Sequence, residues 1–293
     1  MARIAYQDIN FRGKSLQVIE MANSIIAEYQ AEGYDLTLRQ LYYQFVARDI
    51  IPNSDREYKN LGNIVNRARL AGRIDWDAIT DRTRTPRSNN HFDNPGEILD
   101  AAANTYRIDT RIDQDDYIEV WIEKDALVGV IERVCCQLDV PYLSCRGYIS
   151  QSAMWESAQR ILARERTGKC ATVLHLGDHD PSGIDMTRDI QERLELFGTS
   201  AEVRRIALNM DQIEQYDPPP NPAKMSDTRY RGYILKYGHE SWELDALHPK
   251  VISGLVTDEV DAHSNQNKIQ AMTEKQQDHR ERLQHLADNW ELT

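Results

Sequence analysis

Three acidic residues stand directly after strand-like segments of the chain. Residues 117–122 form a β-type run, and Glu123 follows it immediately. Residues 171–176 form another, and Asp178 and Asp180 come just after it. In extended backbone, side chains two residues apart point to the same side, so the two aspartates are placed to converge. The carboxyl ends of parallel strands lie at one edge of a sheet, which would bring Glu123 to the same place.

Converging carboxylates of this kind indicate a site for a divalent metal. Close negative charges raise one another's pKa unless a cation compensates them. Hard oxygen ligands with water left in the shell suit Mg²⁺, which commonly acts on phosphate oxygens. The sequence therefore predicts a magnesium site formed by Glu123, Asp178 and Asp180. The alternative is that Asp180 caps the following helix while Asp178 is solvated.

A tyrosine beside an arginine forms a second chemical pattern, nearer the N-terminus. Residues 38–46 carry an apolar stripe at helical spacing that includes Tyr42, so Tyr42 is assigned to the core. Tyr43 is turned about 100° off this stripe and shares a face with Arg39, four residues earlier. The guanidinium would favour the phenolate or hold a phosphate beside the phenol oxygen. The plain alternative is a boundary tyrosine with an ordinary helical neighbour.

Helices with recognisable start signals are predicted around Tyr43. The first spans residues 13–32, the second ends near residue 48 and the third stops at Gly72. The second and third begin with a Ser or Thr followed three residues later by Glu or Gln, the capping-box spacing: Thr37 with Gln40, and Ser54 with Glu57. Residues 73–76 are predicted as a short strand at the edge of a wing.

This order of elements predicts a winged helix-turn-helix, although any three-helix bundle would give the same pattern. In the winged geometry the third helix lies in a DNA groove. Residues 39–87 hold ten Lys and Arg against six Asp and Glu, a charge of +4 in a chain of −12. A basic segment in an acidic chain indicates a contact surface for nucleic acid. The cations proposed to contact DNA on the third helix are Lys59, Arg67 and Arg69.

The middle of the chain alternates strands and helices, which is typical of βαβ units and a parallel sheet. Strands are expected at residues 117–122, 141–145, 171–176 and 201–208, with helices between them at 125–137, 150–164 and 181–196. The predicted fold class is α/β (α+β overall). The predicted domains are a winged-helix domain over residues 1–112, a metal-binding domain with a mainly parallel sheet flanked by helices over 113–256, and a polar helical tail over 257–293.

Composition excludes several classes of protein. The chain has 293 residues, of which 41% are hydrophobic and 28% charged. Apolar runs are far shorter than the roughly 20 residues of a membrane span, and the first residues lack a signal-peptide core. The four cysteines contain no C-x-x-C pair, which argues against structural zinc and a disulfide framework. We therefore expect a cytoplasmic protein without membrane association.

The two acidic segments resemble the motifs of a Toprim domain. The pattern V-x-I-E-K-D-A-L at residues 120–127 and D-x-D-P-x-G-I at residues 178–184 are similar to the A subunit of topoisomerase VI and its meiotic double-strand-break relatives. The sequence R-Q-L-Y-Y at residues 39–43 resembles that family's winged-helix motif, whose second aromatic residue is the catalytic tyrosine. Residues 243–247 resemble a segment near the end of the domain. The resemblance covers roughly residues 35–250 and is greatest for the compact Mini-A type.

The resemblance implies a transesterification. Tyr43 would attack a DNA phosphodiester to form a 5′-phosphotyrosyl link, with Arg39 binding the phosphate or favouring the phenolate. Mg²⁺ would be the cofactor, and double-stranded DNA the substrate. A homodimer would cut both strands, with one protomer's tyrosine meeting its partner's metal. A separate ATPase (B-type) subunit is a candidate partner, because the chain has no P-loop.

One segment departs from the family pattern. Where the family often has Gly-Lys-Gly-Tyr-Pro, residues 144–150 read S-C-R-G-Y-I-S. Arg146 would replace the lysine as a DNA contact. Two other functions stay open: a Toprim nuclease that hydrolyses DNA with metal-bound water, and a non-catalytic DNA-binding regulator or replication protein.

Overall fold

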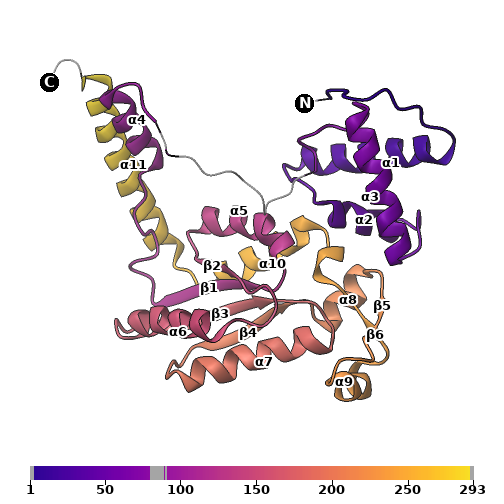
Figure 1. The fold of residues 1–293 in the computed structure, drawn as a ribbon. Coiled ribbons are helices and arrows are strands. Elements are labelled where there is room, and N and C mark those ends of the chain that lie inside the picture. The colour runs from indigo at the N-terminus through magenta and orange to yellow at the C-terminus, as the bar shows by residue number, and fades with distance from the viewer. Residues whose placement is uncertain (1–2, 80–88, 90, 291–293) are drawn as a thin grey trace.

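The computed structural model describes residues 3–79, 89 and 91–290 (Figure 1). It consists of an N-terminal group of helices, a central sheet covered by helices on both faces, and a projecting helical arm near the C-terminus. The class is mixed α/β, as the sequence predicts. None of the helices within the described ranges has the length and apolar character needed to cross a membrane.

The N-terminal unit packs its helices around one apolar core. The helices are α1 (Lys14–Ala31), α2 (Leu38–Ala47) and α3 (Asp55–Leu70). The predicted caps are present: Thr37 and Gln40 form a complete capping box, and Ser54 accepts a hydrogen bond from the backbone N–H of Glu57. Such caps satisfy donors that a helix start leaves unpaired, so local sequence sets where these helices begin.

The predicted strand at residues 73–76 is wrong, because this segment forms bends. The guanidinium of Arg69 lies 4.7 Å from the centroid of the Trp76 ring and donates to the Trp76 carbonyl oxygen at 2.6 Å. The Trp76 indole donates to the carbonyl oxygen of Ile4 at 3.0 Å. These contacts fix the segment in an irregular conformation. The winged form of the helix-turn-helix therefore stays a prediction.

Within the described residues, four parallel strands form one sheet in the order β2-β1-β3-β4. Their bounds agree with the sequence prediction: β1 (Asp116–Ile122), β2 (Tyr142–Ser144), β3 (Cys170–Leu176) and β4 (Glu202–Ala207). Alternate residues of β1 serve opposite faces, with Val120 and Ile122 in one core cluster and Tyr117 and Trp121 in the other. Both faces are buried, which explains why the strands are nearly continuous apolar runs.

Helices α5 and α10 cover one face of the sheet, and α6 and α7 cover the other (Figure 1). The helices of this unit are η1 (Asp125–Leu127), α5 (Val128–Leu138), α6 (Gln151–Glu165), α7 (Pro181–Leu196), α8 (Met210–Tyr216), α9 (Tyr230–Tyr237), η2 (Leu244–Ala246) and α10 (Pro249–Ala262). A short antiparallel pair joins β5 (Asn221–Pro222) to β6 (Glu240–Ser241).

The C-terminal tail is helical, as predicted, but its first part belongs to the core. Helix α10 continues past residue 257 and buries Val256 and Val260. Helix α11 (Gln266–Asp288) then packs along α4 (Pro95–Thr105) to form the projecting arm (Figure 1). The arm therefore joins residues from the predicted first and last domains.

The N-terminal helices contact the sheet unit through α2 and η2. Ala246 of η2 is buried in the same cluster as the N-terminal core. The ring centroids of Tyr29 and His248 lie 4.6 Å apart, next to this contact. Residues distant in sequence are thus joined at the edge of the sheet where the predicted chemistry lies.

A buried charge helps to fix the central strand. Glu119 is 1% exposed and accepts hydrogen bonds from Tyr117 and Trp121 at 2.7 and 2.9 Å. Arg160 of α6 donates to both carboxylate oxygens, at 2.8 and 2.9 Å. A buried carboxylate of this kind is tolerated because its charge and lone pairs are compensated.

Replacing Arg160 with Met should destabilise the fold by about 3 kcal/mol, because Glu119 would stay buried without a counter-charge. The measurement is chemical denaturation at neutral pH. Arg166→Met, at an exposed position at the end of the same helix, is the control and should change the free energy of unfolding by less than about 0.5 kcal/mol. Equal effects of the two variants would show that the Glu119 pair is not a structural requirement.

Candidate functional site

A polar pocket of about 660 Å³ lies at the carboxyl edge of the sheet, where the N-terminal helices meet it. Its walls come from α2, from η1 after β1, from the loop after β3, and from the segments around β5, β6 and η2. The charged residues that line it are Arg39, Asp55, Lys124, Asp125, Asp178, Asp180, Lys224, Glu243 and Asp245. Most of these residues are acidic, so the negative charge of the pocket requires compensation by cations.

The ammonium group of Lys124 lies at the centre of these acids. Its Nζ is 2.6 Å from Glu243 Oε2, 2.9 Å from Asp245 Oδ1 and 3.2 Å from Asp178 Oδ2. The three carboxylates raise the pKa of Lys124 above its usual value despite burial, so the ammonium stays charged. The same contact, with those of Tyr43 and Arg39, lowers the pKa of Glu243 to about 2, although burial opposes this.

Arg39 is the second cation that contacts these acids, and it belongs to α2 of the N-terminal unit. It lies 2.6 Å from Glu243 Oε2 and 3.2 Å from Asp245 Oδ2. Its guanidinium is also 5.8 Å from the centroid of the Tyr43 ring, which confirms that Arg39 and Tyr43 share a face of α2. Glu243 therefore joins the N-terminal unit, through Arg39, to Lys124 of the sheet unit.

Tyr43 is more buried than the sequence predicts. Its side chain is 3% exposed, and it lies in the N-terminal core beside Tyr42. The prediction that Tyr43 stands off the core is wrong because η2 packs over the second face of α2. Burial raises the pKa of the phenol, and Asp245 and a hydrogen bond to Glu243 add to this, while Arg39 opposes them. In this conformation the arginine does not produce a phenolate.

The predicted metal ligands lie at the carboxyl ends of two neighbouring strands, Glu123 after β1 and the two aspartates on the acidic loop after β3, but each already has a partner. Glu123 Oε2 accepts from the backbone N–H of Asp178 at 2.9 Å. Asp178 Oδ1 accepts from the Leu244 N–H at 2.7 Å. Asp180 caps α7 by accepting from the Gly183 N–H at 2.7 Å, as the alternative interpretation has it. Asp178, however, is 8% exposed and not solvated.

The pKa values of these acids reflect crowding. Burial raises the pKa of Glu123 to about 8, and the charges of Asp178 and Asp180 contribute to the rise. Burial raises the pKa of Asp178 to about 6, against the opposing effect of Lys124. Burial and the neighbouring carboxylates thus disfavour the charged forms of both acids, and a cation close to them would favour ionisation.

The donor chemistry of the site fits a hard divalent cation. All candidate ligands are carboxylate oxygens, which Mg²⁺ prefers. Asp245 Oδ2 is buried without a hydrogen bond, although it faces Arg39. The ammonium of Lys124 already marks a position where a cation is bound. Across residues 3–79, 89 and 91–290, however, no group of three or more His, Cys, Asp or Glu side chains is arranged so that it could hold a metal ion. Binding of Mg²⁺ would thus require side chains to rearrange.

A buried arginine supports the acidic loop from below. The guanidinium of Arg205 donates to the carbonyl oxygens of Asp178, Gly177 and Gly183 at 2.6, 2.9 and 2.9 Å. Burial lowers its pKa to about 10, with Glu123 and the aspartates of the loop opposing this effect. The positive charge of Arg205 therefore supports the loop through its backbone carbonyl groups and not through its carboxylates.

Glycines allow the loop to approach Glu123 closely. A Cβ at Gly183 would lie 2.2 Å from the carbonyl oxygen of Asp178 and 3.1 Å from Glu123 Oε2. A Cβ at Gly177 would lie 2.8 Å from the same Glu123 oxygen. The glycine of the D-x-D-P-x-G pattern is thus required by the packing of the loop.

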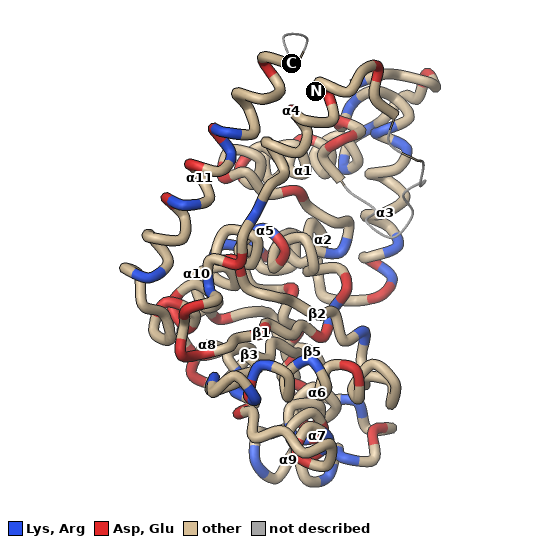
Figure 2. The backbone as a smooth tube through the Cα atoms, turned by 90° about the vertical axis from the view of Figure 1, so that its left-hand side faces the viewer, with Lys and Arg blue, Asp and Glu red and all other residues tan. Residues whose placement is uncertain are grey.

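The predicted DNA contacts are spread over two surfaces. On α3, Lys59 and Arg67 are exposed, whereas Arg69 is half-buried against Trp76. The acidic residues of this helix, Asp55 and Glu57, lie in its first turn, and its last turn is basic (Figure 2). Arg146 is exposed beside the pocket and lies 3.0 Å from Asp125 Oδ1. The three cations of α3 and Arg146 therefore do not form one basic cluster.

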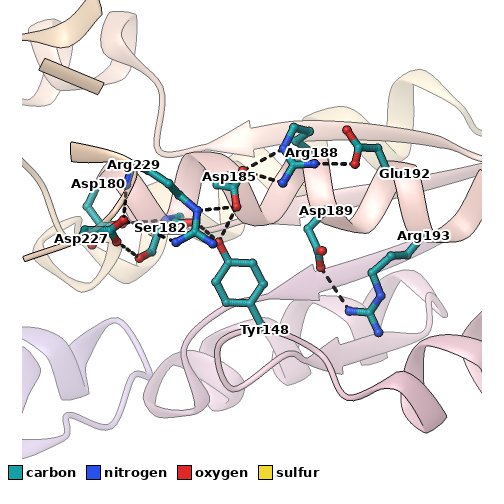
Figure 3. A network of polar contacts seen from close by, with 11 residues as sticks. Tyr148, Asp180, Ser182, Asp185, Arg188, Asp189, Glu192, Arg193, Asp227 and Arg229 are labelled. Atoms are coloured by element: carbon teal, nitrogen blue, oxygen red, sulfur yellow. Dashed lines mark hydrogen bonds and ion pairs between the residues drawn. The ribbon is translucent and has the colours of Figure 1, made fainter. Parts of the chain in front are cut away.

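The loop that departs from the family pattern is fixed by a polar network (Figure 3). Tyr148 donates to Asp185 Oδ2 at 2.7 Å, and Arg229 donates to the same oxygen at 2.6 Å. Ser182 donates to Asp227 at 2.5 Å. These bonds join the loop after β2 to the start of α7 and to the segment before α9.

Sequence reasoning missed Lys124, Arg205, Glu243 and Asp245 as members of the site. Lys124 stands next to Glu123 within the acidic motif, and Glu243 and Asp245 belong to the segment noted as similar to the family. Nothing in the spacing of Arg205 indicates its role. No model of a known protein family matches the chain, and no curated protein matches it significantly.

Changing Gly183 to Ala should lower stability by about 2 kcal/mol, since the added Cβ collides with backbone of the acidic loop. The control is Gly254→Ala in α10, where a Cβ meets no atom within 4 Å. Both glycines are helical, so propensity alone should stabilise each variant by up to about 1 kcal/mol. Thermal denaturation compares them. A stabilised Gly183→Ala protein would contradict the described packing.

Stability should depend on pH through His175, which lies under the loop. Burial lowers its pKa to about 3, and its Nδ1 is 2.8 Å from Thr187 Oγ1. Between pH 6.5 and 3 the unfolded chain binds a proton at this residue and the folded protein does not. Its contribution to stability is therefore lost as pH falls below 6.5.

Comparing wild type with His175→Gln isolates this effect. Between pH 7 and pH 5 the wild type should lose about 2 kcal/mol more than the variant. The measurement is denaturant unfolding at both pH values. Equal losses would show that His175 is not a buried neutral group.

Proposed function

We propose that the protein is a DNA-cleaving transesterase of the type IIB topoisomerase A-subunit kind, with a Toprim-like sheet unit and a winged-helix-like N-terminal unit. Tyr43 attacks a DNA phosphodiester and becomes linked to the 5′ phosphate, while a 3′ hydroxyl leaves. The substrate is double-stranded DNA, and a homodimer makes the double-strand break. A separate ATPase subunit is the partner proposed for strand passage.

The observation that carries this proposal is the meeting of Tyr43 with the acidic edge of the sheet. The ring of Tyr43 lies beside the guanidinium of Arg39, which pairs with Glu243. Glu243 contacts Lys124, which in turn contacts Asp178. A nucleophile and a carboxylate site from distant parts of the chain are thus neighbours. The exposed Arg146 on the rim of this region adds a group suited to a DNA phosphate.

The chain's own residues would divide the work as follows. Arg39 turns from Glu243 to the phosphate, and Glu123, Asp178 and Asp180 hold Mg²⁺. When bound, Mg²⁺ supplies charge neutralisation at the phosphate and the leaving oxygen. The exposed Lys59 and Arg67 bind the DNA backbone, and Arg69 is the least available cation of α3 because Trp76 covers it.

The described conformation is closed with respect to this reaction. Tyr43 is 3% exposed and lies within the N-terminal core. Attack on DNA therefore requires the contact between α2 and η2 to open. In the single chain the tyrosine faces its own acids, whereas the resemblance implies the partner's acids. Opening of the same contact would permit either pairing in a dimer.

The burial of Tyr43 favours a second candidate function, a nuclease that hydrolyses DNA with metal-bound water. In that case the phenol only packs between the two units. Lys124 and the acids of the pocket would act on the phosphate without a covalent intermediate. A non-catalytic DNA-binding protein is the remaining alternative.

A covalent-adduct assay separates these functions. Labelled duplex DNA is incubated with the protein and Mg²⁺, then denatured and resolved on a gel. The wild type should form a protein–DNA adduct, and Tyr43→Phe should reduce it at least 100-fold. Tyr42→Phe is the matched control, because Tyr42 bonds Asn53 and Ser54 and not the acids.

The other outcomes are equally clear. An adduct that persists in Tyr43→Phe would overturn the assignment of the nucleophile. Free cut ends without adduct, in both wild type and variant, would establish the hydrolytic nuclease. Metal-independent DNA binding without cutting would establish the non-catalytic protein.

A further inference from the structure

Lys124 occupies the position of a bound cation. Its ammonium is surrounded by oxygens of Asp178, Glu243 and Asp245, all within 3.2 Å. Tight packing of carboxylates around one point is the arrangement that a divalent ion also requires. One of these oxygens, Asp178 Oδ2, belongs to a predicted metal ligand. The ammonium of Lys124 and a metal bound to Asp178 would therefore compete for the same negative charge.

Electrostatics explains why the ammonium is there. The side chain of Asp245 is 0% exposed and that of Asp178 is 11% exposed. Buried carboxylates without a counter-charge are strongly unfavourable. Arg39 neutralises part of this charge from the N-terminal unit, but it does not contact Asp178 within ion-pair distance. Lys124 is the side chain that joins Asp178 to the other two acids.

We propose that Lys124 is a resident counter-ion that must leave the acids before a divalent cation binds at Asp178. The inference deepens the proposed function and rests on its metal site. The lysine side chain is a flexible stem with a point charge, so it can withdraw without moving backbone. The pocket beside it, of about 660 Å³, has room for the displaced ammonium.

The exchange would connect metal binding to the tyrosine. Glu243 interacts with Lys124, Arg39 and Tyr43 at once. Withdrawal of Lys124 removes one of the contacts that hold Glu243 across the two units. The metal-free protein is then the closed state, and metal binding weakens the contact that shelters the phenol.

The test measures metal affinity and not cleavage. Isothermal titration with Mn²⁺, in the absence of DNA, gives the dissociation constant for wild type and Lys124→Met. Removing the competing charge while keeping the apolar stem should tighten Mn²⁺ binding at least tenfold. Lys169→Met is the control, because Lys169 is a half-buried lysine at the start of β3 that donates to the Arg111 carbonyl oxygen. It should bind Mn²⁺ like the wild type.

Unchanged or weaker Mn²⁺ binding in Lys124→Met would overturn the proposal, since the lysine would then assist the metal or play no part. Lys124→Gln, which also lacks the charge, provides a second measurement by thermal melting. Both variants should melt lower than wild type without metal, and Mn²⁺ should raise their melting temperature more than that of wild type. Equal shifts in wild type and variants would also refute it.

These outcomes are distinct from failure of the proposed function. If no covalent adduct forms but Lys124→Met binds Mn²⁺ more tightly, the transesterase is wrong and the resident counter-ion stands. If the adduct forms and depends on Tyr43 but Mn²⁺ affinity does not change in Lys124→Met, the transesterase stands and the resident counter-ion is wrong.

Discussion

The site depends on the compensation of several buried carboxylates at one edge of a parallel sheet. Asp178 and Asp245 are buried and Glu243 is half-buried, so their negative charges require compensation by cations. Lys124 compensates them from within the sheet unit, and Arg39 does so from the N-terminal unit. The same charges that suit the site for a metal thus also hold the two units together.

This arrangement explains why Tyr43, the proposed nucleophile, is found in a buried position. Tyr43 is part of the N-terminal core, and its ring lies beside the guanidinium of Arg39. The contact combines the ion pairs of Arg39 with the apolar packing of Ala246 and involves few residues of η2, so its opening would cost less than unfolding either core. A protein that cuts DNA benefits from a sheltered nucleophile, because exposure then follows binding of the substrate or metal.

Local signals made much of the fold predictable. The capping box at Thr37 and the alternation of apolar strands with helices predicted the elements, and the strands proved parallel. The prediction of a strand at residues 73–76 was wrong because the side chains of Arg69 and Trp76 interact. A pattern of strand-forming residues contains no signal for such an interaction. The prediction that Tyr43 stands off the core was wrong because η2, which comes from a distant part of the chain, packs on α2.

The site was predictable only in part, for the same reason. Motif spacing placed Glu123, Asp178 and Asp180 at the correct edge of the sheet. Their compensation by Lys124 and by the buried Arg205 depends on side-chain packing across the fold, which leaves no periodic signal in the sequence. The three acids remain predicted metal ligands. The structure adds the hydrogen bonds and the ion pair that they form within the protein.

The most direct test of the account is to locate the covalent bond to DNA. After incubation with DNA and Mg²⁺, nuclease and trypsin digestion leave a peptide over residues 40–48 that contains both Tyr42 and Tyr43. Fragmentation in a mass spectrometer should place the residual nucleotide on Tyr43. A nucleotide on Tyr42 or on another residue, or an unmodified peptide from a preparation that cuts DNA, would contradict the account.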